Sequence, residues 1–485
     1  MKKTELVLIP FPGKSHLVSF IEFAKHLVSR EDRFSVTIMG IKSPFEPITN
    51  STTSSSISIL HPNIKYFDVE PIDPPPFDLL HTARENYLTL FVQSHCSPIK
   101  QIIIDHVLTK PVFFAGVVVD LLTTSLIDLA DELRVPSYVY FTSGAGFVGF
   151  SFYVLSQHEQ DGLTKFNESD SDSNIPSFAN PVPAGVFPSI AFHEQGFMWL
   201  VEMARRSKKT KGIIFNTVLE LEFHSLNSFS DGETPPFYTV GPLLDLKGEG
   251  QEQSFDKTQR RNQIVTWLDD QPLKSVVFLC FGTNGTFGAA QLREIAIGLD
   301  RSGQRFLWSV RKAQHQNRYA PLDEYTDDEL VEILPEGFLE RTKERGMICG
   351  WAPQAEVLAH KATGGFVSHC GWNSTLESLW FGVPIVTWPL YAEQQMNAFQ
   401  MVRDLGLAVE LRLDFRRDKE EVVVADEIEK AVRSVMEGDC ERRKKVEEMS
   451  QNCRGALENG GSSCESFGKL IEAMFAKHLV KSVTL

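Results

Sequence analysis

Short apolar runs alternate along the chain with segments in which apolar residues recur every three or four positions. Residues 6–9 form the first run, residues 10–13 break it with two prolines and a glycine, and residues 17–27 follow with helical spacing. This alternation predicts strands and helices in turn. Further strands of the first half are expected at residues 34–39, 64–69, 116–120, 137–141 and 212–216.

Strands that alternate with helices predict an α/β fold with a doubly wound parallel sheet. Ligands of such sheets bind beyond the carboxyl ends of the strands. His16, Asp120 and Thr142 all follow or end a predicted strand. We therefore expect these three side chains at one edge of the sheet.

The second half of the chain repeats the alternation. A strand at residues 276–281 leads through a glycine loop into a helix at residues 289–301. Later strands are expected at 365–368 and 385–387, and later helices at 398–405, 425–436, 441–452 and 466–479. A chain of 485 residues exceeds the usual size of one hydrophobic core, so two domains are expected. The charged, apolar-poor residues 246–262 are the predicted linker.

Two polar segments interrupt the pattern. Residues 159–188 are acidic and then rich in proline, and residues 313–332 are polar, so both are predicted as mobile surface loops. Asp170 and Asp172 form a DxD sequence, a spacing of two carboxylates that binds metal ions in some enzymes. No strand precedes them to fix the carboxylates, and the prediction is that the chain has no metal site.

Composition narrows the classes of partner. The net charge of −15 disfavours nucleic acids and anionic membrane surfaces through repulsion. No run of about 18 apolar residues occurs, so no membrane span is expected. Seven cysteines are scattered and none forms a CxxC pair, which suggests neither disulfides nor zinc and fits a cytoplasmic location.

Polar and aromatic residues are concentrated between positions 351 and 394. Residues 365–368 suit a buried strand, residues 369–372 a tight turn, and Asn373 a helix N-cap before residues 374–380. A strand, a turn and a helix in this order present free backbone N–H groups and the positive end of a helix dipole. The sequence therefore predicts an anion site at this turn.

Side chains suited to the rest of a nucleotide sugar stand around this anion site. Trp351 offers a flat face on which a base can stack, and Gln354 can bond to sugar hydroxyls. Glu377 lies one helical turn after Asn373 and can accept both hydroxyls of a ribose. His369 can donate to a phosphate. Glu393 and Gln394 pair an acceptor with an amide, and such a pair can read vicinal hydroxyls.

This stretch resembles the 44-residue donor-binding signature of the plant UDP-sugar-dependent glycosyltransferases of small molecules. The resemblance rests on Trp at its first position, Gln at its fourth, HCGWNS in its middle and Glu-Gln at its end. It implies two facing Rossmann-like domains of the GT-B type. The first, residues 1–245, would bind the acceptor and the second, residues 263–465, the UDP-sugar, while a last helix at 466–485 would pack back on the first.

The same resemblance implies a mechanism and roles for particular residues. His16 would be the general base, oriented by Asp120, and displacement would invert the anomeric centre. Thr142 would bond the 6-hydroxyl of the donor sugar. Thr283 stands where the family usually has serine, and either hydroxyl can bond a phosphate. The resemblance assigns donor binding to Thr142, Thr283, Trp351, Ala352, Gln354, His369, Trp372, Asn373, Ser374, Glu377, Glu393 and Gln394.

Several of these residues have ordinary structural interpretations. His16 can be a solvated loop histidine, Asp120 a helix N-cap, and Thr142 a strand-end hydroxyl. Trp372 can touch the sugar or only pack beneath it, and Trp388 suits the core. An apolar acceptor pocket is expected from Phe11, Phe141, Phe147, Phe150, Phe187, Phe197 and Tyr391.

The resemblance is closest to the branch that glycosylates flavonoids, other phenolics and some terpenoids. We expect a monomer that uses UDP-glucose as co-substrate and no other cofactor. The alternatives are the same fold with another UDP-sugar, and a binding protein that has lost turnover. The presence of both His16 and Asp120 argues against the second alternative.

Overall fold

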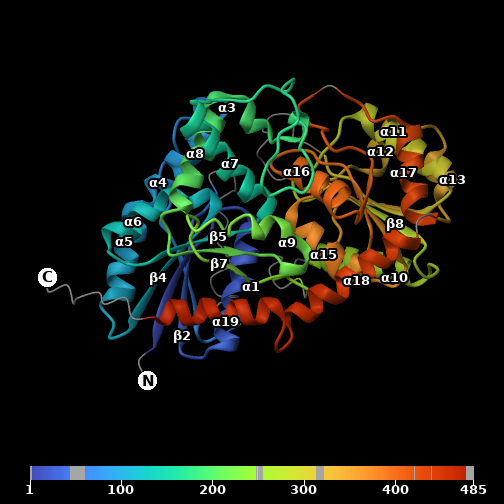
Figure 1. The fold of residues 1–485 in the computed structure, drawn as a ribbon. Coiled ribbons are helices and arrows are strands. Elements are labelled where there is room, and N and C mark those ends of the chain that lie inside the picture. The colour runs from blue at the N-terminus through green and yellow to red at the C-terminus, as the bar shows by residue number, and fades with distance from the viewer. Residues whose placement is uncertain are drawn as a thin grey trace.

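The computed structural model describes residues 3–43, 61–246, 248, 255–312, 322–419, 421–437 and 440–476. Its described strands form two parallel sheets, one in each half of the chain (Figure 1). The first has seven strands in the order β3-β2-β1-β4-β5-β6-β7, and the second has six in the order β10-β9-β8-β11-β12-β13. The predicted α/β class with doubly wound parallel sheets is confirmed.

The strands follow the apolar runs of the sequence. The first sheet contains β1 (Thr4–Ile9), β2 (Phe34–Gly40), β3 (Ile64–Asp68), β4 (Phe113–Asp120), β5 (Ser137–Phe141), β6 (Gly212–Phe215) and β7 (Phe237–Thr239). The second contains β8 (Val276–Cys280), β9 (Arg305–Ser309), β10 (Gly346–Cys349), β11 (Thr363–Ser368), β12 (Ile385–Thr387) and β13 (Ala408–Glu410). Strand β1 is buried at all six positions because helices cover both faces of its sheet.

Helices connect the strands. In the first half they are α1 (Lys14–Arg30), α3 (Phe77–Thr82), α4 (Arg84–Ser94), α5 (Cys96–Ile103), η1 (Ile104–Leu108), η2 (Leu121–Leu126), α6 (Ile127–Glu132), α7 (Ala145–Asp161), η3 (Ala184–Val186), η4 (Ser189–Phe192), α8 (Glu194–Ser207) and α9 (Leu219–Asn227). In the second half they are α10 (Phe255–Asp269), α11 (Ala289–Ser302), α12 (Asp327–Ile333), α13 (Phe338–Thr342), α14 (Gln354–Ala359), α15 (Trp372–Trp380), α16 (Gln394–Phe399), η5 (Gln400–Asp404), α17 (Ala425–Glu437), α18 (Cys440–Leu457) and α19 (Ser462–Phe475). No described helix is both long enough and apolar enough to cross a lipid bilayer.

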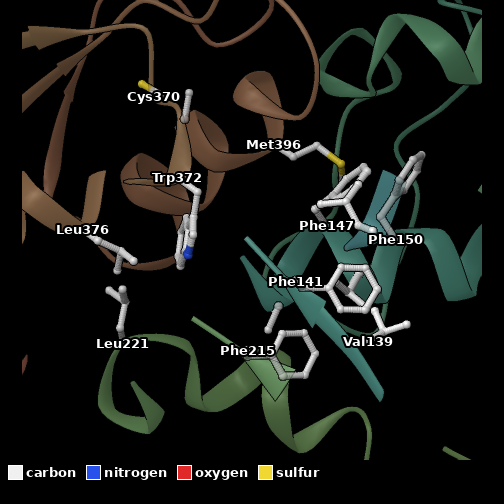
Figure 2. Packing of buried hydrophobic residues seen from close by; sticks show 14 of the residues in the cluster. Val139, Phe141, Phe147, Phe150, Phe215, Leu221, Cys370, Trp372, Leu376 and Met396 are labelled. Atoms are coloured by element: carbon white, nitrogen blue, oxygen red, sulfur yellow. The ribbon is translucent and has the colours of Figure 1, made fainter. Parts of the chain in front are cut away.

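The hydrophobic core joins the two sheets. One cluster of buried side chains runs from the first sheet through α7 and α9 to α15 and α16 of the second half. In Figure 2, Trp372, Leu376 and Met396 extend from the second half toward Leu221 and Phe147 of the first. The two sheets therefore meet through packed apolar side chains as well as through their connecting chain.

The last described helix lies along the first half of the molecule. In Figure 1, α19 runs across the lower side of the first half, between the labels of α1 and β2, although its sequence follows the second sheet. Phe467, Leu470 and Met474 are buried in a cluster with side chains of β1, β2 and α1. Residues 477–485 of the predicted helix lie outside the described residues. The domain bounds 1–245 and 263–465 stay a prediction.

The predicted linker is partly helical. Helix α10 begins at Phe255, inside the expected connector 246–262. Its sequence is mostly polar, and among its side chains that the structure describes, from residue 257 onward, only Ile264 and Leu268 are fully buried. Two apolar residues four positions apart are enough to hold one face of the helix on the core. Residues 249–254 lie outside the described residues.

The prediction of a mobile loop at residues 159–188 was wrong. Helix α7 continues to Asp161, and the rest is fixed by buried side chains at Phe166, Ile175, Phe178 and Val182. An isolated antiparallel bridge joins Ser173 to Val182. Polar residues separate these apolar residues without a regular period. The average composition of the segment therefore did not indicate that it is packed against the core.

The structure also describes the DxD sequence and part of the second predicted loop, residues 313–332. The Asp170 carboxylate accepts from the backbone N–H of Asn167 at 2.8 Å, so it closes a turn. Among the described residues, no group of three or more His, Cys, Asp or Glu side chains could hold a metal ion. In the second predicted loop, residues 313–321 lie outside the described residues, while Thr326 caps helix α12.

Candidate active site

A histidine and an aspartate meet at the carboxyl edge of the first sheet. His16 lies in the first turn of α1, directly after β1, and Asp120 is the last residue of the neighbouring strand β4. Their side chains meet with 2.8 Å between His16 Nδ1 and Asp120 Oδ2. The Thr142 hydroxyl, after β5, lies 3.2 Å from the same Nδ1. The structure therefore brings together the three strand-end residues that the alternation of strands predicts.

Asp120 is rigidly held. It is fully buried, and its Oδ1 accepts from the backbone N–H of Leu122 at 2.9 Å. Its own backbone N–H donates to the Thr123 hydroxyl at 2.8 Å, which completes a capping box on η2. One oxygen of the Asp120 carboxylate therefore caps the helix, and the other oxygen contacts His16.

The environment of His16 suits a base. Burial acts to lower the pKa of the ring, but the charge and hydrogen bond of Asp120 outweigh it, so the pKa is raised above its ordinary value. When Nδ1–H donates to the carboxylate, the lone pair stays on Nε2. The side chain keeps 21% of its surface exposed, and Phe11 packs edge-on against the ring at 5.5 Å between centroids. The ring is oriented and still accessible.

The predicted anion turn lies at the carboxyl edge of the second sheet. Strand β11 ends at Ser368, Cys370 adopts a left-handed φ of 61°, and α15 begins at Trp372. The N-cap is Gly371, which is extended and provides no side-chain cap. Since the first N–H groups of a helix lack partners within it, this turn presents free donors and a positive helix end.

The prediction that Asn373 caps this helix was wrong. Gly371 takes the N-cap position two residues earlier because its extended backbone leads directly out of the turn. Asn373 lies inside the helix, and its Nδ2 donates to the Ser19 hydroxyl of α1 at 3.2 Å. This contact ties the anion turn to the helix that carries His16.

His369 lies tightly enclosed behind the same turn. A Cβ added at Gly282, where φ is +75°, or at Gly371 would lie 2.5 Å from His369 Nε2, so only glycine leaves room for the ring. Burial lowers the pKa of His369 to about 4, and the ring is neutral at neutral pH. Its buried Nδ1 has no hydrogen-bond partner among the described residues. A neutral ring of this kind has one N–H that it can donate to a phosphate.

Three signature residues form a hydrogen-bonded group next to this turn. The amide nitrogen of Gln354 donates to the Ser374 hydroxyl at 2.8 Å and to the Glu377 carboxylate at 2.7 Å. Burial raises the pKa of Glu377 to about 7, against the opposing effect of the Gln354 hydrogen bond. Trp351 is half-buried and Ala352 is buried beside them. Glu377 retains a second oxygen for a ligand hydroxyl.

Glu393 and Gln394 begin α16. Gln394 Oε1 accepts from the backbone N–H groups of Leu390 and Tyr391 at 2.9 and 3.1 Å. Its oxygen is therefore occupied, and only its NH₂ group can serve a ligand, whereas the sequence suggested an amide that both donates and accepts. Burial raises the pKa of Glu393, and its charge contributes to the raised pKa of His16. The two predicted groups therefore approach each other across the two sheets.

The remaining predicted donor residues and Trp388 differ in their surroundings. Trp372 is buried, and its indole N–H donates to the Asn216 carbonyl of the first half at 2.8 Å, so it joins the two halves. Trp388 is fully buried, in accord with a core role. Thr283 lies on the exposed loop after β8. Asn216 was not predicted, although its place at the carboxyl end of β6 is the signal that marked Asp120.

The predicted acceptor residues divide into two groups. Phe150, Phe187 and Phe197 pack with Phe166 at ring centroid distances from 5.0 to 6.3 Å and are buried in the core. Phe141 and Phe147 are also buried in this cluster, and Phe147 lies beside Met396 in Figure 2. Phe11 and Tyr391 are only half-buried, and they adjoin His16 and Gln394 respectively.

Comparison with known proteins places this geometry in a family. Residues 262–451 match the family model described as UDP-glucoronosyl and UDP-glucosyl transferase. The chain is 49% identical to UDP-glycosyltransferase 71K1 of Malus domestica over 99% of this chain and 100% of that protein. It is 45% identical to UDP-glucose flavonoid 3-O-glucosyltransferase 6 of Fragaria ananassa over 97% of this chain and 98% of that protein.

A solved structure agrees with these sequence matches. The crystal structure of Medicago truncatula UGT71G1 complexed with UDP-glucose superposes with a TM-score of 0.87 at 43% identity, over 97% of this chain and 98% of that chain. The GT-B arrangement that the signature implied is thereby confirmed. The chain belongs to the plant UDP-glycosyltransferases and is an enzyme of that family.

Proposed function

We propose that this enzyme transfers glucose from UDP-glucose to a hydroxyl group of a small lipophilic plant metabolite, such as a flavonoid, another phenolic or a terpenoid. One observation carries the proposal: the His16–Asp120 pair of the first half faces the donor-side elements of the second, because Asn373 of the anion turn donates to Ser19 of α1 at 3.2 Å and Glu393, the N-cap of α16, is near enough for its charge to act on His16. A base and a sugar-reading carboxylate so arranged suit an acceptor hydroxyl between them. The name of the Fragaria relative, a UDP-glucose flavonoid 3-O-glucosyltransferase, supports this donor and acceptor class, and the Medicago structure contains UDP-glucose.

The acceptor hydroxyl is a poor nucleophile and must lose its proton as it attacks. His16 Nε2 takes this proton, and the Asp120 carboxylate stabilises the imidazolium that forms. The oxygen forms a bond to the anomeric carbon while the bond from that carbon to the diphosphate breaks. Direct displacement from the opposite face inverts the centre, so an α-linked donor gives a β-glycoside.

The leaving group is held by the second half of the molecule. The uracil base of UDP stacks on Trp351, and the ribose hydroxyls bond to Glu377. The diphosphate lies at the first turn of α15 with His369 and Thr283. Backbone N–H groups at a helix N-terminus stabilise phosphate charge without a metal ion. We propose that the reaction needs no metal and no cofactor beyond the UDP-sugar.

The sugar is read by groups from both halves. Glu393 accepts hydroxyls, the Gln394 NH₂ group donates to a neighbouring one, and Thr142 bonds the 6-hydroxyl. Because the Gln394 oxygen is occupied, discrimination between glucose and its epimers depends on this one donor and on Glu393. We propose preference for UDP-glucose on this basis.

We propose that the enzyme works as a monomer in the cytosol. All seven cysteines are free thiols in the structure, which suits a reducing compartment. Sedimentation at micromolar concentration tests the first statement, and cell fractionation tests the second.

A product assay tests the proposed function. The enzyme is incubated with UDP-glucose or UDP-galactose and a panel of flavonoids, simple phenols and terpenoid alcohols, with and without EDTA, and products are identified by mass spectrometry and NMR. We expect a β-glucoside, a higher kcat/KM for UDP-glucose, and unchanged turnover in EDTA. An α-glycoside, equal use of the two donors, or loss of turnover that manganese restores would contradict the corresponding part of the proposal.

A further inference from the structure

A buried carboxylate outside the signature connects the two halves of the enzyme. Glu222 of α9 has 1% of its surface exposed, and its backbone departs from helical values at φ −116° and ψ 33°. Its oxygens accept from the backbone N–H groups of Ala145 and Gly146 at 2.9 and 3.1 Å. They also accept from the side-chain amide of Gln400 at 3.3 Å. Ala145 and Gly146 belong to the first half, and Gln400 to the second.

The orientation of the Gln400 amide follows from its second partner. The Ser225 hydroxyl donates its proton to the Ser177 carbonyl at 2.7 Å. It must therefore accept from Gln400, whose Nε2 lies 3.0 Å away. The NH₂ group of Gln400 thus points at both Ser225 and Glu222. Each of these three contacts to Glu222 is made by a donor. Burial raises the pKa of Glu222, and these hydrogen bonds act in the opposite direction.

On one side, Glu222 holds the loop that carries Thr142. Ala145 and Gly146 are the first two residues of α7, which follows Thr142 after two residues. A carboxylate at the N-terminus of a 17-residue helix is stabilised by the helix dipole as well as by the N–H groups. Thr142 in turn lies 3.2 Å from His16 Nδ1.

On the other side, Glu222 holds the segment that carries the sugar-reading groups. Gln400 begins η5, which continues directly from α16, and α16 begins with Gln394 after Glu393 as its N-cap. Helix α15, which follows the anion turn, also lies close to Glu222. A Cβ added at Gly144 would lie 3.0 Å both from Glu222 Oε1 and from the Trp372 ring. Elements that carry the proposed general base and elements that carry the proposed UDP-sugar site therefore both lie next to the Glu222 carboxylate.

We propose that Glu222 is a positioning residue for glycosyl transfer: through Gln400 it sets the placement of the donor half against the His16 half. It touches neither substrate in this scheme. Its loss would leave the UDP-binding groups intact, because these groups belong to the second half, but would misplace the anomeric carbon relative to the acceptor hydroxyl. The inference rests on the proposed division of base and donor between the two halves.

The test compares Glu222→Gln and Gln400→Met with Glu220→Gln as a matched control. Glu220 lies on the same helix but is exposed, where it accepts from the Ser462 hydroxyl. For each variant, kcat is measured with UDP-glucose and one phenol, the Kd for UDP by calorimetry, and kcat/KM against pH. We expect kcat to fall about 10- to 100-fold in both test variants, since misplacement of reacting groups by about 1 Å has effects of this order. The Kd for UDP should change less than twofold, and Glu220→Gln should match the parent enzyme.

Two further measurements separate positioning from mere structural support. The acidic limb of kcat/KM should move little, since the charge and hydrogen bond of Asp120, the main causes of the raised pKa of His16, are unchanged. The double variant should lose no more than the larger single effect, because both substitutions break one link. Gln400→Met leaves Glu222 its donors within the first half, so it tests the link even where Glu222→Gln folds poorly. A lower Tm with parental kcat in Gln400→Met, or effects that multiply in the double variant, would overturn the inference.

The two proposals fail differently. If His16→Ala keeps parental turnover, the proposed function is wrong whatever Glu222 does. If His16→Ala abolishes turnover while Gln400→Met keeps the parental kcat, only the positioning role of Glu222 is wrong.

Discussion

At the scale of single residues, the enzyme depends on how burial and charge act on a few titratable groups. The charge of Asp120 raises the pKa of His16, while burial without a partner lowers that of His369 to about 4. The first histidine is therefore more basic than an ordinary histidine, and the second stays neutral at neutral pH. These different surroundings suit the different roles proposed for the two histidines.

The raised pKa of His16 has a consequence for the pH profile. His16 acts as a base only when neutral, so kcat/KM should fall as pH decreases through a pKa above the ordinary 6.5. Asp120→Asn removes the charge that raises this pKa, so the acidic limb should move to lower pH while kcat falls. Profiles of kcat/KM between pH 5 and 9 check this. A limb that stays in place in Asp120→Asn would contradict the assignment.

Glu377 provides a test of the donor side. Glu377→Ala removes the acceptor proposed for the ribose hydroxyls and leaves Gln354 without one of its partners. The loss should weaken UDP binding by about 1–3 kcal/mol. Calorimetry with UDP measures this directly. Glu356→Ala is the control, because Glu356 pairs with Arg261 on the neighbouring surface and should leave UDP affinity unchanged.

Sequence reasoning predicted where some of these residues lie, but not all their contacts. His16 and Asp120 were predicted at one sheet edge because each follows a strand, although 104 positions separate them. The occupied oxygen of Gln394 was not predictable, since its partners are the N–H groups of a turn whose shape depends on the fold. Glu222 carries no local signal either, because its role comes from Gln400, 178 positions away.

At the scale of elements, strand-turn-helix units build both edges of the active site. In the second sheet, the turn after β8 and the turn after β11 meet at His369, which Gly282 and Gly371 enclose. Strands β5 and β12 have the predicted bounds because short apolar runs are bounded there by prolines and turn residues. Helix α15 begins earlier than predicted because Gly371, rather than a polar side chain, takes the N-cap.

The enclosure of His369 predicts the effect of one methyl group. Gly282→Ala requires a non-glycine residue at φ +75° and places its Cβ 2.5 Å from the His369 ring. Such backbone strain costs about 1–3 kcal/mol, and the ring must also shift. The strain itself lowers stability, whereas the displaced His369 ring loses its proposed contact with the phosphate, so we expect UDP affinity to fall roughly 5- to 150-fold, as measured by calorimetry. Gly288→Ala in the same loop is the control, since nothing lies within 4 Å of the added Cβ; equal effects of the two substitutions would count against the enclosure.

At the scale of the whole molecule, contacts between the halves are polar as well as apolar. Residues 159–188, which were predicted as a mobile loop, make several of the polar contacts with the second half. Asp404 accepts from the backbone N–H groups of Ala179 and Asn180 at 3.1 and 3.2 Å. Arg416 is buried, and its guanidinium donates to the carbonyls of Gly185 and Phe187, each at 2.7 Å. The second half therefore fixes a segment of the first that has no secondary structure of its own for much of its length.

Removal of this guanidinium should destabilise the folded enzyme. Arg416→Ala leaves the two carbonyls and the Ser189 hydroxyl without their donor, at a cost of about 1–3 kcal/mol. We expect Tm to fall by a few degrees in thermal unfolding. Arg301→Ala removes an exposed ion pair with Asp426 and should change Tm little. If the two variants have the same Tm, the buried contacts do not stabilise the junction.

The central claim is that chemistry and nucleotide binding are divided between the two halves, and one comparison tests it most directly. Turnover on one phenol and the Kd for UDP are measured for His16→Ala, with His224→Ala, an exposed histidine of the first half, as the control. Loss of a general base should reduce kcat by about 10²- to 10⁴-fold, while the Kd for UDP and the control variant stay at parental values. A His16→Ala enzyme with near parental turnover, or one that no longer binds UDP, would contradict the account.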